Sequence, residues 1–323
     1  MGRYVVWPIA LLCACGQGPG PGMTGDDTTP RPDAGPPPPP CGLRGGGRGV
    51  SQRDVTIDGA KRTYLTYLPD AGDPTTPMPF VMVFHGFTMS GQLMFDITEY
   101  AKLADSEHIA LVFPDGQGGP NTTAAPWNVG ASVCPSFFGP PPVAPGDDFA
   151  FVDAMKADVA QDQCLDSEHV YVTGFSMGGY FSHHAGCMRT DVRAVAPHSG
   201  GTHDLAGCAN DRMPIIIFHG ASDPVIPVGC DDPAASAVSG AEPSAKAWAE
   251  HNGCATTTTP VAVDNATCVR FDGCPAGGQV ELCTFAGMGH CWAGGAASQG
   301  AYSCPTYAKA TELEWQFFKD FAF

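Results

Sequence analysis

The chain has 323 residues, of which 43% are hydrophobic, enough to bury the core of one large α/β domain or of two ordinary ones. Its 33 acidic residues outnumber its 16 basic ones and give a formal charge of −17. Because nucleic acids and anionic membrane surfaces attract positive charge, this balance argues against either as a partner.

The first 14 residues are typical of an export signal. A charged start at Arg3 is followed by an apolar run to Ala14 that is too short to span a bilayer. The segment Leu12-Cys13-Ala14-Cys15 is similar to the lipobox of bacterial lipoproteins, which predicts lipidation of Cys15. An ordinary signal peptide cut near the same point is the alternative. We expect an exported protein, extracellular or in the cell envelope, that is held at an outer membrane or cell surface only through this lipid.

Residues 15–49 are mostly Gly, Pro, Thr and Asp, with an unbroken proline run over 36–40. A segment of this composition buries too little apolar surface to fold, and its prolines stiffen it. We therefore expect a signal peptide over 1–14, a tether over 15–49 and one folded domain over 50–323.

Fourteen cysteines are present, and two of them, Cys13 and Cys15, lie in the leader. The remaining number is even, which in an exported protein indicates disulfides. A zinc site is the competing interpretation, but no Cys-x-x-Cys pair has a matching partner pair, so no metal is expected. Spacing does not determine connectivity. The local pairs that the sequence suggests are Cys164–Cys187, Cys254–Cys268 and Cys274–Cys283.

A hairpin opens the expected domain. Asp54–Ile57 and Tyr64–Leu68 are β-rich runs, and Asp58-Gly59 between them is a strong turn signal. The run Phe80–Phe84 is apolar throughout, as in strands buried on both faces of a parallel sheet. From there strands alternate with helices, which predicts a mostly parallel, doubly wound α/β sheet with an antiparallel N-terminal hairpin and helices on both faces. The further expected elements are helices over 95–107, 147–164, 177–187, 245–252 and 306–323 and strands over 109–113, 169–173, 194–197, 215–218 and 279–285.

A serine lies between two glycines where the strand over 169–173 meets the next helix, in Gly174-Phe175-Ser176-Met177-Gly178. A Gly-rich turn is the plain alternative. The context favours a nucleophile, because a strand that turns sharply into a helix strains the residue at its apex and needs neighbours without bulk. The Ser176 hydroxyl would stand at a helix N-terminus, where backbone N–H groups favour developing negative charge.

A serine nucleophile needs a base and a carboxylate that orients the base. In α/β-hydrolases the acid and then the histidine follow the serine along the chain, each on a loop after a strand. Asp223 and His290 match that order. Asp231 and Asp232 are fallback acids, and His198, which also ends a strand, is the rival base.

The oxyanion formed during acyl transfer needs two fixed hydrogen-bond donors. We expect the backbone N–H of Met177, directly after the nucleophile, and that of Phe87, with Thr88 as its neighbour. His85 and His219 each precede a glycine at a strand end, where imidazoles usually brace loops through hydrogen bonds.

Residues 116–146 form a long loop rich in Pro and Gly that contains Trp127 and Cys134. Long loops in compact domains are usually functional or disordered, and the aromatic residues argue against disorder. Trp127 either anchors the core or contacts the substrate, and we take it as a candidate substrate-binding residue.

Seven motifs in order along the domain carry a resemblance to a known family. They are HGF, PDG, WNVGASVC, DDFAFVDAM, GFSMGG, HGASDPVIP and GMGHCW. The set, from Asp54 to Phe321, resembles the secreted esterase and polyhydroxybutyrate depolymerase family, which includes bacterial feruloyl and acetylxylan esterases. The resemblance implies an α/β-hydrolase fold with little lid and no cofactor. The residues that it implies at the site are Ser176, Asp223 and His290 for acyl transfer and Trp127, Cys134 and Asp148 for an adjacent wall.

Two features depart from relatives of this kind. Fungal tannase-type feruloyl esterases join a cysteine beside the serine to a cysteine beside the histidine. Here Phe175 precedes Ser176, so Cys291, which follows His290, must pair elsewhere, and Cys304 is the candidate. No separate carbohydrate- or polyester-binding module is evident, which weakens the case for an insoluble polymer as substrate.

These features predict an exported serine carboxylesterase that works through an acyl-enzyme and resembles feruloyl and acetylxylan esterases. A polyhydroxybutyrate depolymerase, which hydrolyses hydroxyalkanoate esters, is the first alternative. A serine peptidase of the prolyl-oligopeptidase type shares the serine turn, but the first 50 residues are too few for its propeller. A non-catalytic surface lipoprotein is the last alternative. The expected partner is a small or polymeric ester, with no nucleic acid and no obligate protein partner.

Overall fold

The computed structural model describes residues 41–44, 48–70, 73–119, 125–129, 147–202, 205–230 and 240–321, all within one compact unit from Pro40 to Phe323. The expected signal peptide, the lipid site at Cys15 and the tether before residue 41 lie outside the described residues, as do Cys134, Asp231 and Asp232. None of the helices in the described ranges is long and apolar enough to cross a bilayer.

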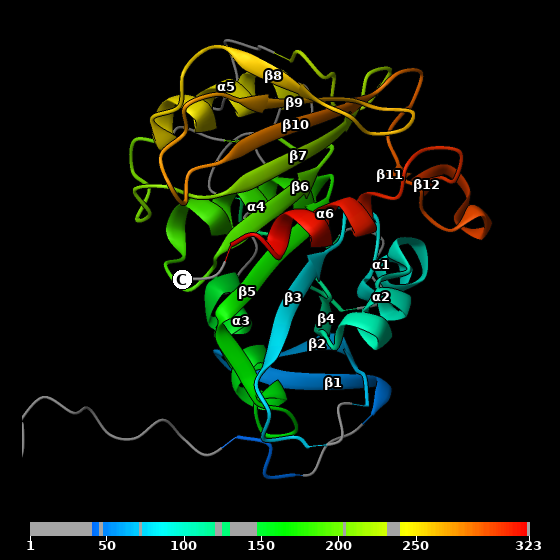
Figure 1. Ribbon diagram of the computed structural model, residues 1–323. Coiled ribbons are helices and arrows are strands. Elements are labelled where there is room, and N and C mark those ends of the chain that lie inside the picture. The colour runs from blue at the N-terminus through cyan, green and yellow to red at the C-terminus, as the bar shows by residue number, and fades with distance from the viewer. Residues whose placement is uncertain are drawn as a thin grey trace, which may run out of the picture. The chain divides into compact units, whose positions relative to one another are not determined.

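A ten-stranded sheet forms the centre of the described unit (Figure 1). Its strand order is β1 (Gly49–Ile57), β2 (Ala60–Leu68), β4 (Ala110–Pro114), β3 (Met78–Phe84), β5 (Leu165–Phe175), β6 (Ala194–His198), β7 (Ile215–Gly220), β10 (Val280–Phe285), β9 (Thr267–Phe271) and β8 (Thr258–Val261). The six strands β4, β3, β5, β6, β7 and β10, which are consecutive in the sheet, run parallel. Strands β2 and β9 flank them in antiparallel orientation and pair in turn with β1 and β8.

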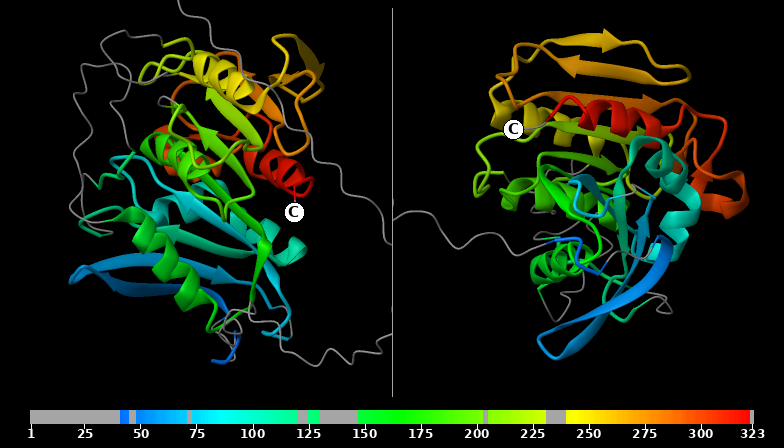
Figure 2. Two further views of the ribbon diagram at one scale, coloured as in Figure 1. Left: turned by 90° about the vertical axis from the view of Figure 1, so that its left-hand side faces the viewer. Right: turned by 60° about the horizontal axis from the view of Figure 1, so that its bottom comes forward.

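Helices cover both faces of the sheet, and each face has its own core (Figures 1 and 2). One layer contains α3 (Asp148–Val159), α4 (Met177–Met188) and α5 (Ala241–Asn252), and the other contains α1 (Gly91–Thr98), α2 (Tyr100–Glu107) and α6 (Ala310–Phe318). Side chains of β3 alternate between the two cores: Phe80 and Met82 pack in the first, Val81 and Val83 in the second. The predicted α/β sheet with helices on both faces is confirmed.

Asp58 and Gly59 form the predicted turn between β1 and β2, with Ile57 opposite Ala60. Their φ angles are 51° and 79°. Positive φ at both positions defines a type I′ turn, whose twist matches that of the two strands it joins. The strands are longer than expected, because the antiparallel pairing continues from this turn to Gly49.

The single helix expected over 95–107 is two helices, α1 and α2. Between them Glu99 has a left-handed backbone conformation, with φ 54°. The break leaves the Thr98 carbonyl free to accept a hydrogen bond from Thr311 Oγ1 at 2.8 Å. Because Thr311 lies far away in the sequence, the local helical pattern carried no sign of this interruption.

The cysteines pair differently from three of the four expectations. The described residues contain the disulfides Cys41–Cys164, Cys187–Cys208, Cys254–Cys274, Cys268–Cys283 and Cys291–Cys304. The expected pairs Cys164–Cys187, Cys254–Cys268 and Cys274–Cys283 are therefore wrong, and the structure agrees with Cys291–Cys304. The sequence did not predict β9, in which Cys268 lies directly opposite Cys283 of β10. This strand register determines their pairing.

The folded unit begins before the expected boundary at residue 50. Cys41 is joined to Cys164, and the Gly42 amide donates a hydrogen bond to the Ala160 carbonyl at 2.8 Å. Residues 41–44 therefore belong to the fold rather than to a tether, because a disulfide and backbone hydrogen bonds join them to residues 160–164.

Candidate active site

Ser176 occupies the sharp turn between β5 and α4, with φ 57° and ψ −116°. Its amide donates to the His198 carbonyl at 2.9 Å. A Cβ atom on Gly174 would lie 2.4 Å from the Gly178 carbonyl oxygen, and one on Gly178 would lie 2.2 Å from that of Phe84. Side chains do not fit at such distances, so the two glycines are required for the turn to pack against β3. The structure has the strained turn that the motif predicts.

Asp223 and His290 lie on the loops that follow β7 and β10, which are neighbouring strands. His290 Nδ1 donates a hydrogen bond to Asp223 Oδ2 at 2.8 Å. Asp223 Oδ1 accepts from the amides of Val225 and Ile226 at 2.8 and 2.9 Å. Both carboxylate oxygens are therefore engaged, and Nε2 is the ring nitrogen of His290 that can accept a proton.

The Asp223 carboxyl is suited to remain ionised. Burial would raise its pKa, but the hydrogen bond and charge of His290 and the Ile226 amide outweigh burial and hold the pKa below its ordinary value. His219, buried beneath the same loop, donates from Nε2 to the Ile226 carbonyl at 2.7 Å. Burial lowers the pKa of His219, so its ring is neutral and braces the acid loop as predicted.

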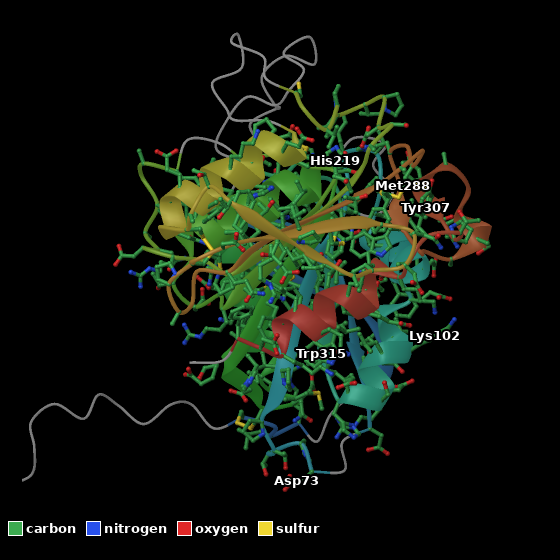
Figure 3. All side chains as sticks on the ribbon, turned by 45° about the horizontal axis from the view of Figure 1, so that its top comes forward. Asp73, Lys102, His219, Met288, Tyr307 and Trp315 are labelled. Carbon is green, nitrogen blue, oxygen red and sulfur yellow. A yellow bond between two sulfur atoms is a disulfide. The ribbon has the colours of Figure 1, made fainter. Side chains whose placement is uncertain are left out.

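The histidine loop is tied to its surroundings at the edge of the sheet where Figure 3 labels His219, Met288 and Tyr307. The Met288 carbonyl accepts from the Ser222 amide at 2.9 Å, and Tyr307 donates its hydroxyl to a carbonyl of the same loop, also at 2.9 Å. The ring of Phe175, the residue before the nucleophile candidate, lies 4.6 Å from the His290 ring. The serine turn and the histidine loop therefore adjoin.

His198, the rival base, lies in the core. Its ring stacks on Trp292 at 3.7 Å and on Phe218 at 4.6 Å, and its Nε2 is paired with the carboxylate of Glu314. Both members of this pair are buried. His198 contacts the serine turn through its backbone carbonyl, so its imidazole supports the core beneath the turn.

The loop after β3 passes directly beside the serine. A Cβ atom on Gly86 would lie 3.1 Å from Ser176 Cβ. Phe87 is 37% exposed. Met177 is the first residue of α4, and the first amides of a helix have no acceptor within it. The loop that carries Phe87 and the first residue of α4, Met177, thus lie next to the serine turn, and the role of their amides as oxyanion donors stays a prediction.

His85 braces this loop from inside. Its Nδ1 donates to the Gly86 carbonyl at 2.7 Å, and its Nε2 accepts from the Gly116 amide at 2.8 Å. A backbone N–H can only donate, so the proton of the neutral ring must be on Nδ1. Burial lowers the pKa of His85 to about 4, which keeps the ring neutral at neutral pH.

Trp127 does not contact the substrate side of the site, contrary to our expectation. Its side chain is 0% exposed and packs edge-on against Phe84 at 5.0 Å. Its indole N–H donates to the His85 carbonyl at 2.9 Å. Asp148 is also buried and pairs with Arg62 at 2.8 Å. Trp127 therefore supports the β3 loop from the interior, whereas Asp148 binds Arg62 and the Asn128 amide next to Trp127.

A family model described as esterase PHB depolymerase matches residues 62–240, more than half of the chain. The chain belongs to this family. Feruloyl esterase B of Piromyces equi is 29% identical to it over 242 residues, which cover 71% of this chain and 42% of that protein. Feruloyl esterase C of Emericella nidulans is 31% identical over 177 residues, 52% of this chain and 57% of that protein. The chain thus spans less than two thirds of the length of either relative.

Among solved structures, an acetyl xylan esterase from Aspergillus awamori is similar, with a TM-score of 0.55 and 14% identity over 83% of this chain and 99% of that one. At this identity the likeness concerns the fold alone, which is that of the α/β-hydrolases. The described residues of this esterase PHB depolymerase family member include no group of three or more His, Cys, Asp or Glu that could hold a metal ion.

The match to the esterase PHB depolymerase family includes Ser176 and Asp223 but ends before His290. The assignment of His290 therefore depends on the geometry. Sequence reasoning missed Tyr302, whose hydroxyl lies 3.0 Å from Thr88 Oγ1 and whose ring lies 6.4 Å from that of Phe175. No motif marks Tyr302, because a turn of 3₁₀ helix, η2 (Ala297–Tyr302), and a disulfide bring it to the site.

Proposed function

We propose that this protein is a serine carboxylesterase that works through an acyl-enzyme. The observation that carries the proposal is the hydrogen bond between His290 and the ionised Asp223, beside the strained turn at Ser176. A serine hydroxyl is a weak nucleophile until a positioned base removes its proton. The arrangement supports that chemistry, since the carboxylate orients the imidazole and stabilises its protonated form.

In the proposed reaction, Ser176 Oγ attacks the ester carbonyl carbon while His290 Nε2 takes the hydroxyl proton. The amides of Met177 and Phe87 donate to the oxyanion. Collapse of the intermediate breaks the bond to the alcohol, which leaves with the proton from His290. Water then adds to the acyl-enzyme with His290 again as base, and release of the carboxylic acid returns the proton to Ser176.

We propose aryl or acetyl esters of plant polysaccharides as substrates. The names of the relatives support feruloyl esters, and the exposed ring of Phe87, with Tyr302 nearby, offers aromatic surface beside the serine. The description of the family favours hydroxyalkanoate esters as the second candidate. Initial rates on methyl ferulate, acetylated xylan, hydroxybutyrate oligomers and peptide amides separate these candidates. Preferential cleavage of the hydroxybutyrate oligomers would favour the second one.

Replacement of Ser176 by alanine tests the mechanism. Ser176→Ala should lower hydrolysis of methyl ferulate or p-nitrophenyl acetate by about 10³-fold or more, because the nucleophile is lost. It should also abolish labelling by a fluorophosphonate. The control is Ser106→Ala, which changes an exposed serine on α2 and should leave both readouts unchanged. Full activity of Ser176→Ala on these esters would exclude the mechanism, and a wild-type protein that takes up no fluorophosphonate would favour a binding role.

We propose that the protein functions outside the cytoplasm, with a lipid on Cys15 as its anchor. Five disulfides among the described residues support the location, because such bonds persist in oxidising compartments. The lipobox-like residues before Cys15 support the anchor.

A further inference from the structure

The segment over 125–129 contacts the backbone of the loop that carries Phe87. The His85 carbonyl accepts a hydrogen bond from Trp127 Nε1 at 2.9 Å. The Phe87 carbonyl accepts from the Ala125 amide, also at 2.9 Å. One short segment therefore holds the carbonyls on both sides of Gly86.

The carbonyl between these two is held from within the loop. Gly86 O accepts from His85 Nδ1 at 2.7 Å and from the Met89 amide at 3.0 Å. In a trans peptide group the N–H points opposite to the C=O, so these bonds determine the direction of the Phe87 N–H. The orientation of this donor depends on the position of the His85 ring, and hence on whatever holds the His85 backbone.

The segment is in turn anchored to a buried ion pair. The Asn128 amide donates to Asp148 Oδ2 at 2.7 Å, and Arg62 Nη2 donates to Asp148 Oδ1 at 2.8 Å. Both charged side chains are at most 4% exposed, and the guanidinium lies 4.2 Å from the ring centre of Phe151. The pair is therefore rigid, and Asp148 passes this rigidity to the residue next to Trp127.

We infer that Trp127 is a positioning residue for the oxyanion hole, acting through the His85 carbonyl on the Phe87 amide, with Asp148 and Arg62 as its anchor. The inference rests on the proposed function. Because Trp127 is fully buried, its effect on the reaction is indirect and does not come from contact with the substrate. An oxyanion donor contributes only when it is aimed at the developing charge, and loss of one such donor typically costs about 10²- to 10³-fold in kcat.

The test removes the indole N–H in two variants, of which the second also keeps the shape of the side chain. Trp127→Phe is the genetic variant, and replacement of Trp127 by benzothienylalanine, in which sulfur takes the place of the N–H, is the isosteric one. We expect kcat on methyl ferulate to fall by about 10- to 100-fold, less than for complete loss of a donor, with KM within about twofold. The affinity for an arylboronic acid that mimics the tetrahedral intermediate should fall by the same factor as kcat/KM.

Trp248 provides the matched control. It is also 0% exposed, and its indole N–H donates to His183 Nδ1 at 2.9 Å, but it lies on α5. The same two replacements at Trp248 should lower the melting temperature to a similar extent and leave kcat within about twofold of wild type. Equal losses of kcat at Trp127 and Trp248 would overturn the inference, because they would indicate general loosening of the core.

The remaining outcomes are also decisive. Folded Trp127 variants with wild-type kcat, or with a raised KM alone, would overturn the positioning role while the proposed function stands. If Trp127→Phe does not fold, the kcat of the benzothienylalanine protein decides between the two outcomes, since that side chain fills the same volume. If the wild-type protein shows no ester hydrolysis that Ser176→Ala abolishes, the proposed function and this inference are both overturned.

Discussion

Buried imidazoles hold the loops around Ser176 by hydrogen bonds to backbone carbonyls. His85 donates to Gly86, and His219 donates to Ile226. Their positions before glycines at strand ends made a bracing role predictable. Their partners were not predictable, because they depend on how each loop folds back over its strand. The rings are neutral since burial disfavours the charged form, and this neutrality has a measurable consequence for stability.

We expect His85 to make the protein less stable in mild acid. Its pKa is about 4 in the folded protein against 6.5 ordinarily, so between these values the unfolded chain binds a proton that the folded chain does not. Stability from this group is complete above 6.5 and falls as the pH drops towards about 4, by up to about 3 kcal/mol.

His85→Asn tests this expectation, because the amide keeps a donor near Gly86 and does not titrate. The free energy of unfolding in urea, measured at pH 7.5 and pH 5 for both proteins, should change less with pH in the variant. An identical pH dependence in the two proteins would show that His85 does not carry the effect.

At the scale of elements, a small lobe connects the histidine loop to the oxyanion loop. It begins at the residue after His290 and consists of β11 (Trp292–Ala293), η2 and β12 (Ser303–Cys304), closed by Cys291–Cys304. At the end of η2, the Tyr302 hydroxyl is hydrogen-bonded to Thr88 Oγ1. The disulfide therefore supports both the histidine loop, through Cys291, and the contact of Tyr302 with the oxyanion loop, through Cys304. It does so with a loop of only 13 positions.

The double variant Cys291→Ser with Cys304→Ser should lose activity as well as stability. The disulfides Cys291–Cys304 and Cys254–Cys274 close loops of similar length, so by the chain-entropy argument each contributes about 3 kcal/mol to stability. The control is Cys254→Ser with Cys274→Ser, which removes a disulfide whose cysteines are 20 positions apart. This disulfide lies near the start of β10, whereas His290 follows the end of that strand. Steady-state kinetics on methyl ferulate below both melting temperatures should show kcat reduced several-fold in the first variant only. Equal kcat in the two variants would exclude a positioning role for the lobe.

At the scale of the whole molecule, Cys41–Cys164 closes the longest of the described disulfide loops. Its cysteines are 123 positions apart, and by chain entropy a loop of this length is worth about 4 to 5 kcal/mol. The bond attaches the start of the folded unit directly before β5, the strand that leads to Ser176.

The full chain, expressed in a bacterium that processes lipoproteins, should partition with membranes through the lipid that we propose on Cys15. Cys15→Ser should release active enzyme in soluble form, since the charge of −17 gives the protein little attraction for anionic lipid. Fractionation followed by esterase assay measures this, with Cys13→Ser as the control that keeps Cys15. Unchanged partitioning of Cys15→Ser would rule out the anchor.

Features that depend on neighbouring residues could be predicted from the chain alone. The type I′ hairpin at Asp58-Gly59, the alternation of strands with helices and the glycine pattern at Ser176 are of this kind. In each, backbone sterics within a few residues restrict the possible conformations. The order of Ser176, Asp223 and His290 was also visible, because the fold places each on a loop after a strand.

By itself, then, the sequence determined the parallel centre of the sheet with its N-terminal hairpin, the strained serine turn and the order of the candidate catalytic residues, all of which depend on local backbone preferences and strand order. Only the tertiary structure decided that Cys268 faces Cys283, that His198 lies in the core and that Tyr302 reaches the site. It also made Trp127 a buried support for the oxyanion loop. These outcomes depend on strand register and on which side chains the core encloses, and residues far apart in the chain set both.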